Sequence, residues 1–234
     1  MPTGAACQLS AWRSFIGKSL MTRIVIFAKA PQPGSVKTRL IPVLGPDGAA
    51  TLARHLLAHT VNEALAADVG EVELCMSPSA EDPAWQDIAI HNDVKQTAQR
   101  GGDLGERMAC AVRRVTVQTQ AADTAVLLMG TDCPELTAAF LQQAAQQLQT
   151  HDAVLLPAHD GGYVLLGLKS PCPELFGNMP WSTSVVAAET LRRMAALKLH
   201  VWLGPVLHDI DEPADLQHLP DSMAKMLSVS LTVA

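Results

Sequence analysis

Short apolar segments alternate along the chain with segments of helical periodicity, and this alternation constrains the fold more than any other feature. The first apolar segment, residues 23–28, is rich in β-branched residues, as is typical of a strand buried on both faces. Similar segments recur at 72–76, 125–130, 153–157, 163–168 and 199–203. Helical patterns, with apolar residues three or four positions apart, lie at 52–65, 104–115 and 136–148.

This order of segments predicts an α/β fold with a mainly parallel central sheet and helices on both faces. The length of 234 residues suits a single domain, which we place at 21–220 because no long linker interrupts it. We expect residues 1–20 to form a disordered extension and residues 221–234 to form a C-terminal tail. Sheets of this kind bind ligands beyond the carboxyl ends of their strands, so we expect the chemistry in the segments that follow strands.

The charge balance and the cysteine pattern argue against several classes of protein. The chain has 17 lysines and arginines against 23 aspartates and glutamates, and its net charge of −6 offers no positive field to attract a nucleic acid. Its apolar runs fall far short of the roughly 20 residues of a membrane-spanning helix, so we expect no membrane partner. Its five cysteines are widely spaced and odd in number, which argues against a disulfide framework and predicts a cytoplasmic location.

The segment after the first strand, residues 29–40, combines three cations with turn-forming residues. Its sequence is K-A-P-Q-P-G-S-V-K-T-R-L, in which Gly34 permits a tight turn, and Lys37 and Arg39 follow near a helix start. Fixed positive charge and backbone N–H groups at a helix N-terminus are what a diphosphate requires. We interpret the segment as an anion-binding loop, and the alternative is a solvated basic loop.

Two acidic segments follow strands and suggest a metal site. In G-T-D-C-P, at 130–134, Asp132 is placed to hold a metal ion, although it is equally suited to cap the helix expected to begin near Pro134. The late segment D-I-D-E, at 209–212, offers further carboxylates. Mg²⁺ and Mn²⁺ prefer oxygen ligands and commonly combine one or two protein carboxylates with phosphate oxygens. The acidic segments and the basic loop together therefore predict a metal-diphosphate site.

Glycines and an aspartate connect two neighbouring strands in the sequence H-D-G-G-Y, at 159–163. Adjacent glycines let the backbone approach a ligand closely, and Asp160 can accept a proton or hold a hydroxyl group. The alternative is a plain hairpin turn, for which Asp-Gly and Gly-Gly are common connections.

Two further segments contain candidate binding residues. Trp181 offers a flat face to a sugar or base, or else packs in the core. The hydroxyl groups of Ser182 and Thr183 are interpreted as helix caps. In Q-R-G-G-D-L-G-E-R-M, at 99–108, we expect Asp103 to cap a helix and Arg107 to reach a ligand.

Histidine and cysteine residues provide weaker candidates. His55 and His59 are one helical turn apart but lack an evident third ligand, so we expect them on an exposed helix face rather than on zinc. Cys133 lies beside Asp132, whose negative charge raises a thiol pKa, so we expect no nucleophilic cysteine there.

Six segments together resemble one known family. They are F-A-K-A-P-Q-P-G-S-V-K-T-R-L at 27–40, G-D-L-G-E-R-M at 102–108, G-T-D-C-P at 130–134, D-G-G-Y at 160–163, W-S-T at 181–183 and D-I-D-E-P-A-D-L at 209–216. In this order they resemble the bacterial family known as domain of unknown function 2064, or as arsenosugar-biosynthesis-type glycosyltransferases, of the nucleotide-diphospho-sugar transferase superfamily. The resemblance covers about residues 23–219.

The resemblance implies a GT-A fold, a Rossmann-like three-layer α/β/α sandwich. It also implies that Asp132 takes the role of the D-x-D metal ligand, and because G-T-D offers one carboxylate we assign the second ligand to Asp211, with Asp209 next. The expected nucleotide and diphosphate-binding residues are Ala28, Lys29, Gly34, Lys37, Arg39, Gly105 and Arg107. The expected sugar or acceptor-binding residues are Gly161, Gly162, Tyr163, Trp181, Ser182 and Thr183.

The function implied is a metal-dependent glycosyltransferase that moves a sugar from a nucleotide-diphospho-sugar donor to a small acceptor and releases a nucleoside diphosphate. Mg²⁺ or Mn²⁺, with Lys37 and Arg39, would neutralise the leaving diphosphate, and Asp160 would be the base of an inverting reaction. Related nucleotidyltransferases, including guanylyltransferases, share this scaffold, so the alternative joins a nucleoside triphosphate to a phosphorylated acceptor and releases pyrophosphate. A third alternative is a nucleotide-sensing or partner-binding module without activity.

Overall fold

The computed structural model describes residues 20–118 and 124–232, so the extension expected at residues 1–20 lies, except for Leu20, outside the described residues. The strands are β1 (Met21–Lys29), β2 (Val72–Ser77), β3 (Lys95–Ala98), β4 (Thr124–Met129), β5 (Ala153–Pro157), β6 (Tyr163–Leu168) and β7 (Val201–Leu203). The α-helices are α1 (Ile41–Ala66), α2 (Leu104–Gln118), α3 (Ala138–Gln147), α4 (Val186–Ala196) and α5 (Asp221–Thr232). Short 3₁₀-helices are η2 (Thr38–Leu40), η3 (Pro83–Trp85), η4 (Pro173–Leu175) and η5 (Pro213–His218).

The strands form one seven-stranded sheet in the order β3-β2-β1-β4-β6-β5-β7. Every neighbouring pair is parallel except the two that β6 makes with β4 and β5. In the centre, Ile24 of β1 pairs with Val72 on one side and with Leu127 on the other. All six residues of β4 are buried, which agrees with its continuous apolar sequence. The predicted mainly parallel sheet is therefore confirmed, with β6 as the reversed strand.

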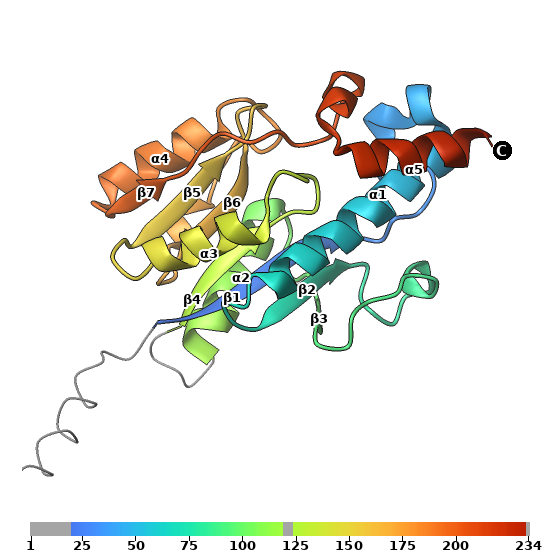
Figure 1. Cartoon of the computed structure of the whole chain (residues 1–234). Helices are drawn as coiled ribbons and strands as arrows, with labels where there is room; N and C mark the ends of the chain where they lie inside the picture. The colour runs from blue at the N-terminus through green and yellow to red at the C-terminus, as the bar shows by residue number, and fades with distance from the viewer. Residues whose placement is uncertain (1–19, 119–123, 233–234) are drawn as a thin grey trace, which may run out of the picture.

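Helices cover both faces of this sheet (Figure 1). Because successive side chains of a strand point to opposite faces, the neighbours Ile24 and Val25 belong to different cores. Ile24 packs in the core that α1 and α3 cover, together with Leu57. Val25 packs in the core that α2 and α4 cover, together with Val112 and Met194. The three-layer sandwich expected from the sequence is the observed architecture.

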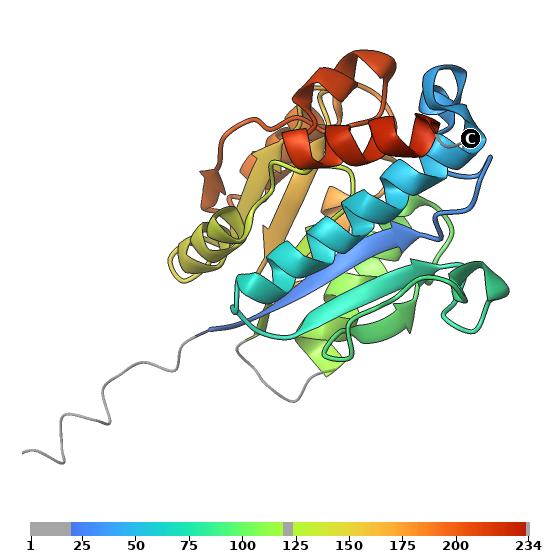
Figure 2. The same ribbon diagram turned by 45° about the vertical axis from the view of Figure 1, so that its right-hand side comes forward.

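A third, smaller core joins the C-terminal end of the chain to the loop after β1. It contains Leu40, three leucines of α1, Ile210, and Met223 and Leu227 of α5. In both views α5 lies across the N-terminal part of α1 (Figures 1 and 2). This core holds the D-I-D-E segment against the loop that follows β1.

The sequence analysis did not identify β3 or α5. β3 is a short, mostly exposed edge strand with the polar sequence K-Q-T-A, and it lacks the apolar run that marked the other strands. α5 occupies the segment that we had interpreted as a tail. Within the described residues, no helix combines the length and the apolar character needed to cross a lipid bilayer.

Candidate active site

Connecting segments meet at the edge of the sheet where its parallel strands end. They follow β1, β4, β5 and β7 in the chain. At this edge lies a cavity of about 520 Å³, in the position where sheets of this class bind ligands. The charged residues of its lining are Arg39, Asp132, Asp160, Asp209, Asp211 and Glu212. One arginine among five acids gives the wall a strongly negative charge.

Lys37, in the loop after β1, contacts the segments that follow β4 and β7. Its ammonium Nζ lies 2.6 Å from Oδ1 of Asp132 and also donates a hydrogen bond to the carbonyl oxygen of Ile210. The backbone N–H of Ile210 in turn donates to the carbonyl oxygen of Asp132 over 2.8 Å. The Lys37 side chain is only 5% exposed, whereas that of Asp132 is 51% exposed and lines the cavity. Lys37 is therefore a buried cation that fixes the position of Asp132.

Asp132 does not cap a helix, which was the alternative interpretation of its position. The N-cap residue of α3 is Thr137, well beyond the G-T-D-C-P segment. The carboxylate of Asp132 instead faces Lys37 and the cavity.

Arg39, in η2, pairs with the late acidic segment. Its Nη1 lies 2.8 Å from Oδ2 of Asp211 and 3.4 Å from Oε1 of Glu212. The backbone N–H groups of these two acids donate to Asp215, which fixes the turn before η5. Asp211, our first choice for the second metal ligand, is thus already partnered by an arginine. Glu212 lines the cavity as well, and the sequence analysis did not single it out.

A smaller recess of about 150 Å³ has Asp132, Asp160 and Asp209 in its lining. Burial raises the pKa of the Asp209 carboxyl to about 6, and the negative charge of Asp160 is the next cause, with Asp215 and Asp132 adding to it. These acids therefore repel one another, and a divalent cation between them would remove the repulsion. An all-oxygen donor set fits Mg²⁺ or Mn²⁺.

The three carboxylates line the same recess, but their oxygen atoms do not converge on one point. Within the described residues, their oxygen atoms do not all come within 4.8 Å of one another. Of the two late aspartates, Asp209 lines this recess beside Asp132, whereas Asp211 does not line it and pairs with Arg39.

The H-D-G-G-Y segment forms the hairpin that joins β5 to β6. Oδ1 of Asp160 accepts a hydrogen bond of 2.7 Å from the backbone N–H of Gly162, and both residues line the cavity. Gly161 has φ of 89°, and a Cβ atom there would lie 2.0 Å from the carbonyl oxygen of Ser184. Its carbonyl oxygen also accepts a hydrogen bond from Ala187 at the start of α4. The turn is thus closely packed onto α4, and Asp160 projects from a fixed backbone.

Trp181 and Tyr163 provide an aromatic part of the cavity wall. The Tyr163 hydroxyl lies 3.8 Å from Sδ of Met108, and burial raises its pKa. A Cβ atom on Gly105 would lie 3.0 Å from Cζ2 of Trp181 and 2.7 Å from the carbonyl oxygen of Phe176. Gly105, which we expected at the diphosphate, instead lets the start of α2 pack against the indole ring.

The two hydroxyl-bearing residues after Trp181 also line the cavity. Ser182 has φ of 62° and Thr183 donates a hydrogen bond of 2.6 Å to the carbonyl oxygen of Pro180. The N-cap residue of α4 is Val185, so neither hydroxyl is its N-cap. Acceptor binding by these two residues stays a prediction.

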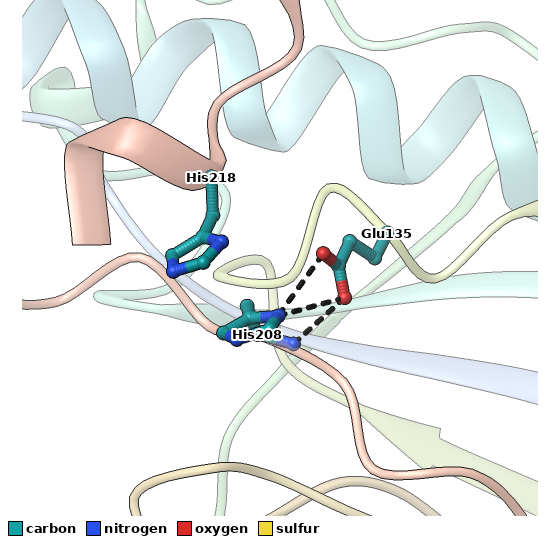
Figure 3. A group of neighbouring side chains, drawn as sticks. All are labelled: Glu135, His208 and His218. Carbon is teal, nitrogen blue, oxygen red and sulfur yellow. Dashed lines mark hydrogen bonds and ion pairs between the residues drawn. The ribbon is translucent and has the colours of Figure 1, made fainter.

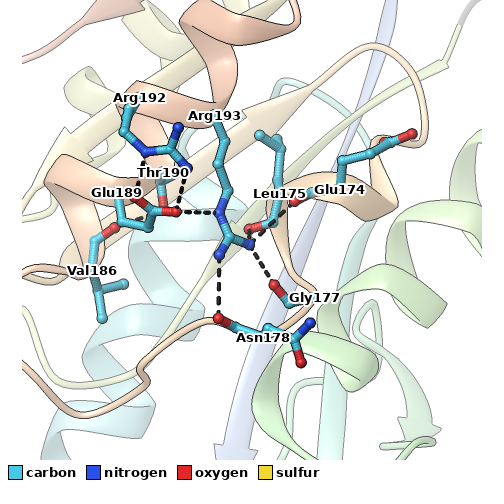
Figure 4. A network of polar contacts seen from close by, with 9 residues as sticks. All are labelled: Glu174, Leu175, Gly177, Asn178, Val186, Glu189, Thr190, Arg192 and Arg193. Atoms are coloured by element: carbon cyan, nitrogen blue, oxygen red, sulfur yellow. Dashed lines mark hydrogen bonds and ion pairs between the residues drawn. The ribbon is translucent and has the colours of Figure 1, made fainter.

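Arg193 of α4 holds the loop that leads to Trp181 (Figure 4). Its guanidinium donates hydrogen bonds to the carbonyl oxygens of Glu174, Leu175, Gly177 and Asn178. Its Nε also donates to Glu189 over 2.7 Å. Hydrogen bonds from Arg192 and then from Arg193 lower the pKa of Glu189 to about 2. Nothing in the sequence pattern indicated this role, because the partners are backbone atoms.

The start of the loop after β1 is folded onto itself. Ala28 is 2% exposed, and Nζ of Lys29 donates a hydrogen bond of 2.8 Å to the carbonyl oxygen of Ser35. Gly34 has φ of 75°, as its expected place in a tight turn requires. None of these residues lines the cavity, whose contact with this loop is through Arg39.

The 99–108 segment is held by internal hydrogen bonds. Oδ1 of Asp103 accepts from the backbone N–H of Glu106 over 2.9 Å, so Asp103 caps α2 as predicted. Arg107 donates to the carbonyl oxygen of Gly102 over 3.0 Å and to Oε1 of Gln99 over 3.2 Å. Arg107 lies in the first turn of α2, its side chain bonds to the segment before this helix, and it is not among the residues that line the cavity.

The expected exposure of His55 and His59 is wrong. Both are partly buried: Nε2 of His59 lies 2.9 Å from the carbonyl oxygen of Pro134, in the segment after β4, and His55 lines a hollow with Ile88 and Ile90. Cys133 is buried, and burial raises the pKa of its thiol to about 12. This agrees with the expectation that Cys133 is not a nucleophile.

Comparison with known proteins places this geometry among transferases. A family profile described as "Uncharacterized protein conserved in bacteria (DUF2064)" matches residues 60–183, more than half of the chain. A crystal structure from Desulfovibrio desulfuricans G20, provisionally named a nucleotide-diphospho-sugar transferase, is 35% identical, with a TM-score of 0.78 over 86% of this chain and 87% of that chain. The search of curated proteins found no match.

More distant solved structures share the fold. A nucleotidyl transferase from Methanothermobacter thermautotrophicus is 16% identical, with a TM-score of 0.54 over 88% of this chain and 99% of that chain. A cytidylyltransferase from Leptospira borgpetersenii is 12% identical, with a TM-score of 0.53 over 92% of this chain and 96% of that chain. The fold therefore occurs both in a protein named as a nucleotide-diphospho-sugar transferase and in proteins named as nucleotidyltransferases.

Proposed function

As this chain belongs to the bacterial family DUF2064, we propose that it is a metal-dependent glycosyltransferase that uses a nucleotide-diphospho-sugar donor and a small acceptor. Its fold is that of nucleotide-diphospho-sugar transferases and nucleotidyltransferases, which supports a nucleotide-using transferase. The choice of glycosyl transfer rests on the 35% identical structure and on the cavity.

The negative charge of the cavity wall carries the proposal. Lys37 and Arg39 offset two of the five acids, so the wall keeps a net negative charge that would repel a free diphosphate, and an anionic donor needs a divalent cation between itself and these carboxylates. Asp132 and Asp209 would hold Mg²⁺ or Mn²⁺, since both face the recess and their all-oxygen donor set suits these ions. The bound ion would supply positive charge beside the diphosphate.

Lys37 and Arg39 hold the protein groups around the leaving diphosphate in place. As the glycosidic bond breaks, negative charge builds up on the departing phosphate oxygens, and preorganised cations stabilise that state more than the ground state. Arg39 lines the cavity directly, whereas Lys37 is buried behind Asp132 and fixes its orientation. We assign Arg39 to the diphosphate and Lys37 to positioning.

Asp160 and the aromatic wall form the acceptor side. The Asp160 carboxylate is held by the backbone of Gly162 and faces the cavity, so it can accept the proton of an acceptor hydroxyl in an inverting reaction. Trp181 and Tyr163 offer apolar surface on which a sugar ring packs.

The reaction products test the proposal. The purified chain is incubated with a panel of nucleotide sugars or nucleoside triphosphates, with Mn²⁺, Mg²⁺ or EDTA, and with candidate acceptors. A glycosyltransferase releases a nucleoside diphosphate, even through slow hydrolysis of the donor, and only when the metal is present. Release of pyrophosphate from a triphosphate supports the nucleotidyltransferase alternative instead, and turnover that is unchanged in EDTA contradicts the metal dependence.

Asp132→Ala provides the matched loss-of-function variant. Removing the carboxylate should lower the turnover at least about a hundredfold, as for the loss of other preorganised electrostatic groups. Asp221→Asn, at the start of α5, is the control, because it changes the charge equally and this residue is not in the cavity wall.

A further inference from the structure

A second group of ligand-type side chains lies outside the cavity (Figure 3). Glu135 comes from the segment after β4, His208 from the segment after β7, and His218 from the end of η5. One ligand atom of each lies within 4.8 Å of the others, and all three side chains are partly buried. None of the three lines the 520 Å³ cavity.

The carboxylate of Glu135 already orients His208. Its oxygens lie 3.1 and 3.4 Å from Nδ1 of the imidazole, and Oε2 accepts a hydrogen bond of 2.9 Å from the backbone N–H of His208. Two ligands of one tetrahedral zinc ion, each bound at about 2.0–2.1 Å, lie about 3.3 Å apart. The distance of 3.1 Å between Oε1 of Glu135 and Nδ1 of His208 is thus close to the distance between two ligand atoms of one zinc ion.

The second imidazole is stacked against the first. The rings of His208 and His218 have centroids 3.7 Å apart and are inclined by 12°. His159 stacks on His208 as well, at 3.8 Å and 13°. Because a nitrogen lone pair lies in the ring plane, two nearly parallel rings must splay for both to reach one ion. Metal binding therefore separates the stacked rings.

The chemistry of this group differs from that of the acidic recess. Two imidazoles and one carboxylate suit zinc and the neighbouring transition metals, whereas an all-oxygen set suits Mg²⁺ and Mn²⁺. Among the described residues, His208 is the single ion-pair partner of Glu135, so no lysine or arginine occupies the carboxylate.

We propose that Glu135, His208 and His218 form a binding site for a zinc-type divalent ion, separate from the magnesium or manganese site of the cavity. Such an ion would fasten the 208–218 segment to the segment after β4. His208 directly precedes Asp209, and Glu135 follows Asp132 by three positions, so the ion would fix the distance between these two acids. The site does not depend on the reaction proposed for the cavity.

Zinc titration of the full chain tests this site. The protein is stripped with EDTA and titrated calorimetrically with zinc chloride in excess Mg²⁺, which occupies the acidic recess and competes poorly for imidazole. We expect one zinc ion per chain. Cobalt chloride should give the visible d–d absorption of Co²⁺ with nitrogen ligands, and a hundredfold excess of zinc over its Kd should raise Tm by about 5–10 °C.

Two variants and one control decide the assignment. Glu135→Gln and His218→Ala should each weaken zinc binding at least tenfold, beyond the usual effect of changing an outer-shell group. His200→Ala is the control, because His200 belongs to another stacked pair, with His151, whose centroids are 4.2 Å apart. Equal metal-free Tm values show that the variants are folded.

The proposal is overturned if the wild-type chain binds no zinc in Mg²⁺, or if both site variants bind zinc as tightly as it does. Loss of binding in His200→Ala to the same degree would also overturn it. The donor and product assays of the cavity use Mg²⁺ or Mn²⁺ alone, so failure of the zinc site and failure of the proposed reaction are separate results.

Discussion

Replacing Asp209 by asparagine should stabilise the metal-free protein and abolish its response to Mn²⁺. Burial and the charges of Asp160, Asp215 and Asp132 raise the Asp209 pKa from 3.8 to about 6. A group whose folded-state pKa is raised in this way binds its proton more tightly in the folded state, so stability falls as pH rises between these two values. Above pH 6 the destabilisation is complete, and below pH 4 it is absent.

The size of the effect follows from the shift and from the exposure of the side chain. Two pKa units correspond to at most about 3 kcal/mol, and because Asp209 is only half-buried we discount this to about 1 kcal/mol. For a chain of this length, 1 kcal/mol corresponds to roughly 2–4 °C in Tm. We therefore expect Asp209→Asn to have the higher Tm at pH 7.5 without metal, and the same Tm as wild type at pH 4.

Asp211→Asn is the matched control in a thermal-shift assay. Asp211 pairs with Arg39, and both side chains are well exposed, so its loss should change the free energy of unfolding by less than about 0.5 kcal/mol. Mn²⁺ should stabilise the wild type and Asp211→Asn but not Asp209→Asn. If Asp209→Asn keeps the Mn²⁺ response while Asp211→Asn loses it, Asp211 is the metal ligand and the assignment to Asp209 is refuted.

Five further substitutions test other parts of the site. Gly161→Ala should lower the free energy of unfolding by at least about 2 kcal/mol, because its Cβ would lie 2.0 Å from a carbonyl oxygen at φ of 89°. Gly162→Ala, whose Cβ would meet a carboxylate oxygen at 3.0 Å, should cost less than about 1 kcal/mol, and urea denaturation compares the two. Lys37→Met should lower the free energy of unfolding by about 2 kcal/mol in the same assay, because it removes the buried cation that pairs with the half-exposed Asp132 carboxylate. An unchanged urea midpoint would contradict that role. Asp160→Asn should lower kcat about a hundredfold with little change in donor affinity, and near-normal turnover would remove Asp160 as the base. Arg193→Lys keeps the charge but loses the several N–H donors of the guanidinium that hold the loop before Trp181. It should therefore raise the acceptor KM more than the donor Kd, and equal changes in both would argue against an effect through this loop.

The alternation of apolar and helical segments was sufficient to predict the mainly parallel sheet and the edge at which the cavity lies. The centre of β1, at Ile24, Val25 and Ile26, and all of β4 are buried on both faces, so their sequences contain continuous apolar runs that are easy to recognise. β3 is polar because it is a mostly exposed edge strand. The burial of α5 depends on Leu40 and Leu52, which are far from it in the sequence and give no local signal.

The parts of the site that depend on strand ends were predictable, and those that depend on long-range pairing were not. Asp132 and Asp160 follow strands directly, which places them at the cavity. The preference for Asp209 over Asp211 needed the Arg39 ion pair, and that contact joins residues more than 170 positions apart. The packing of Gly105 against Trp181 could not be predicted either, because these two residues are also far apart in the sequence.

The third core has a consequence for how the molecule opens. Leu40, Ile210 and Met223 belong to a cluster separate from the two cores that cover the sheet. Loss of α5 from α1 would therefore release the Arg39 and Asp209 segments while the sheet stays folded. Amide hydrogen exchange should accordingly show the cavity rim opening at lower free energy than the strands, so that substitutions in α5 and substitutions in the sheet should change rim opening and global unfolding independently.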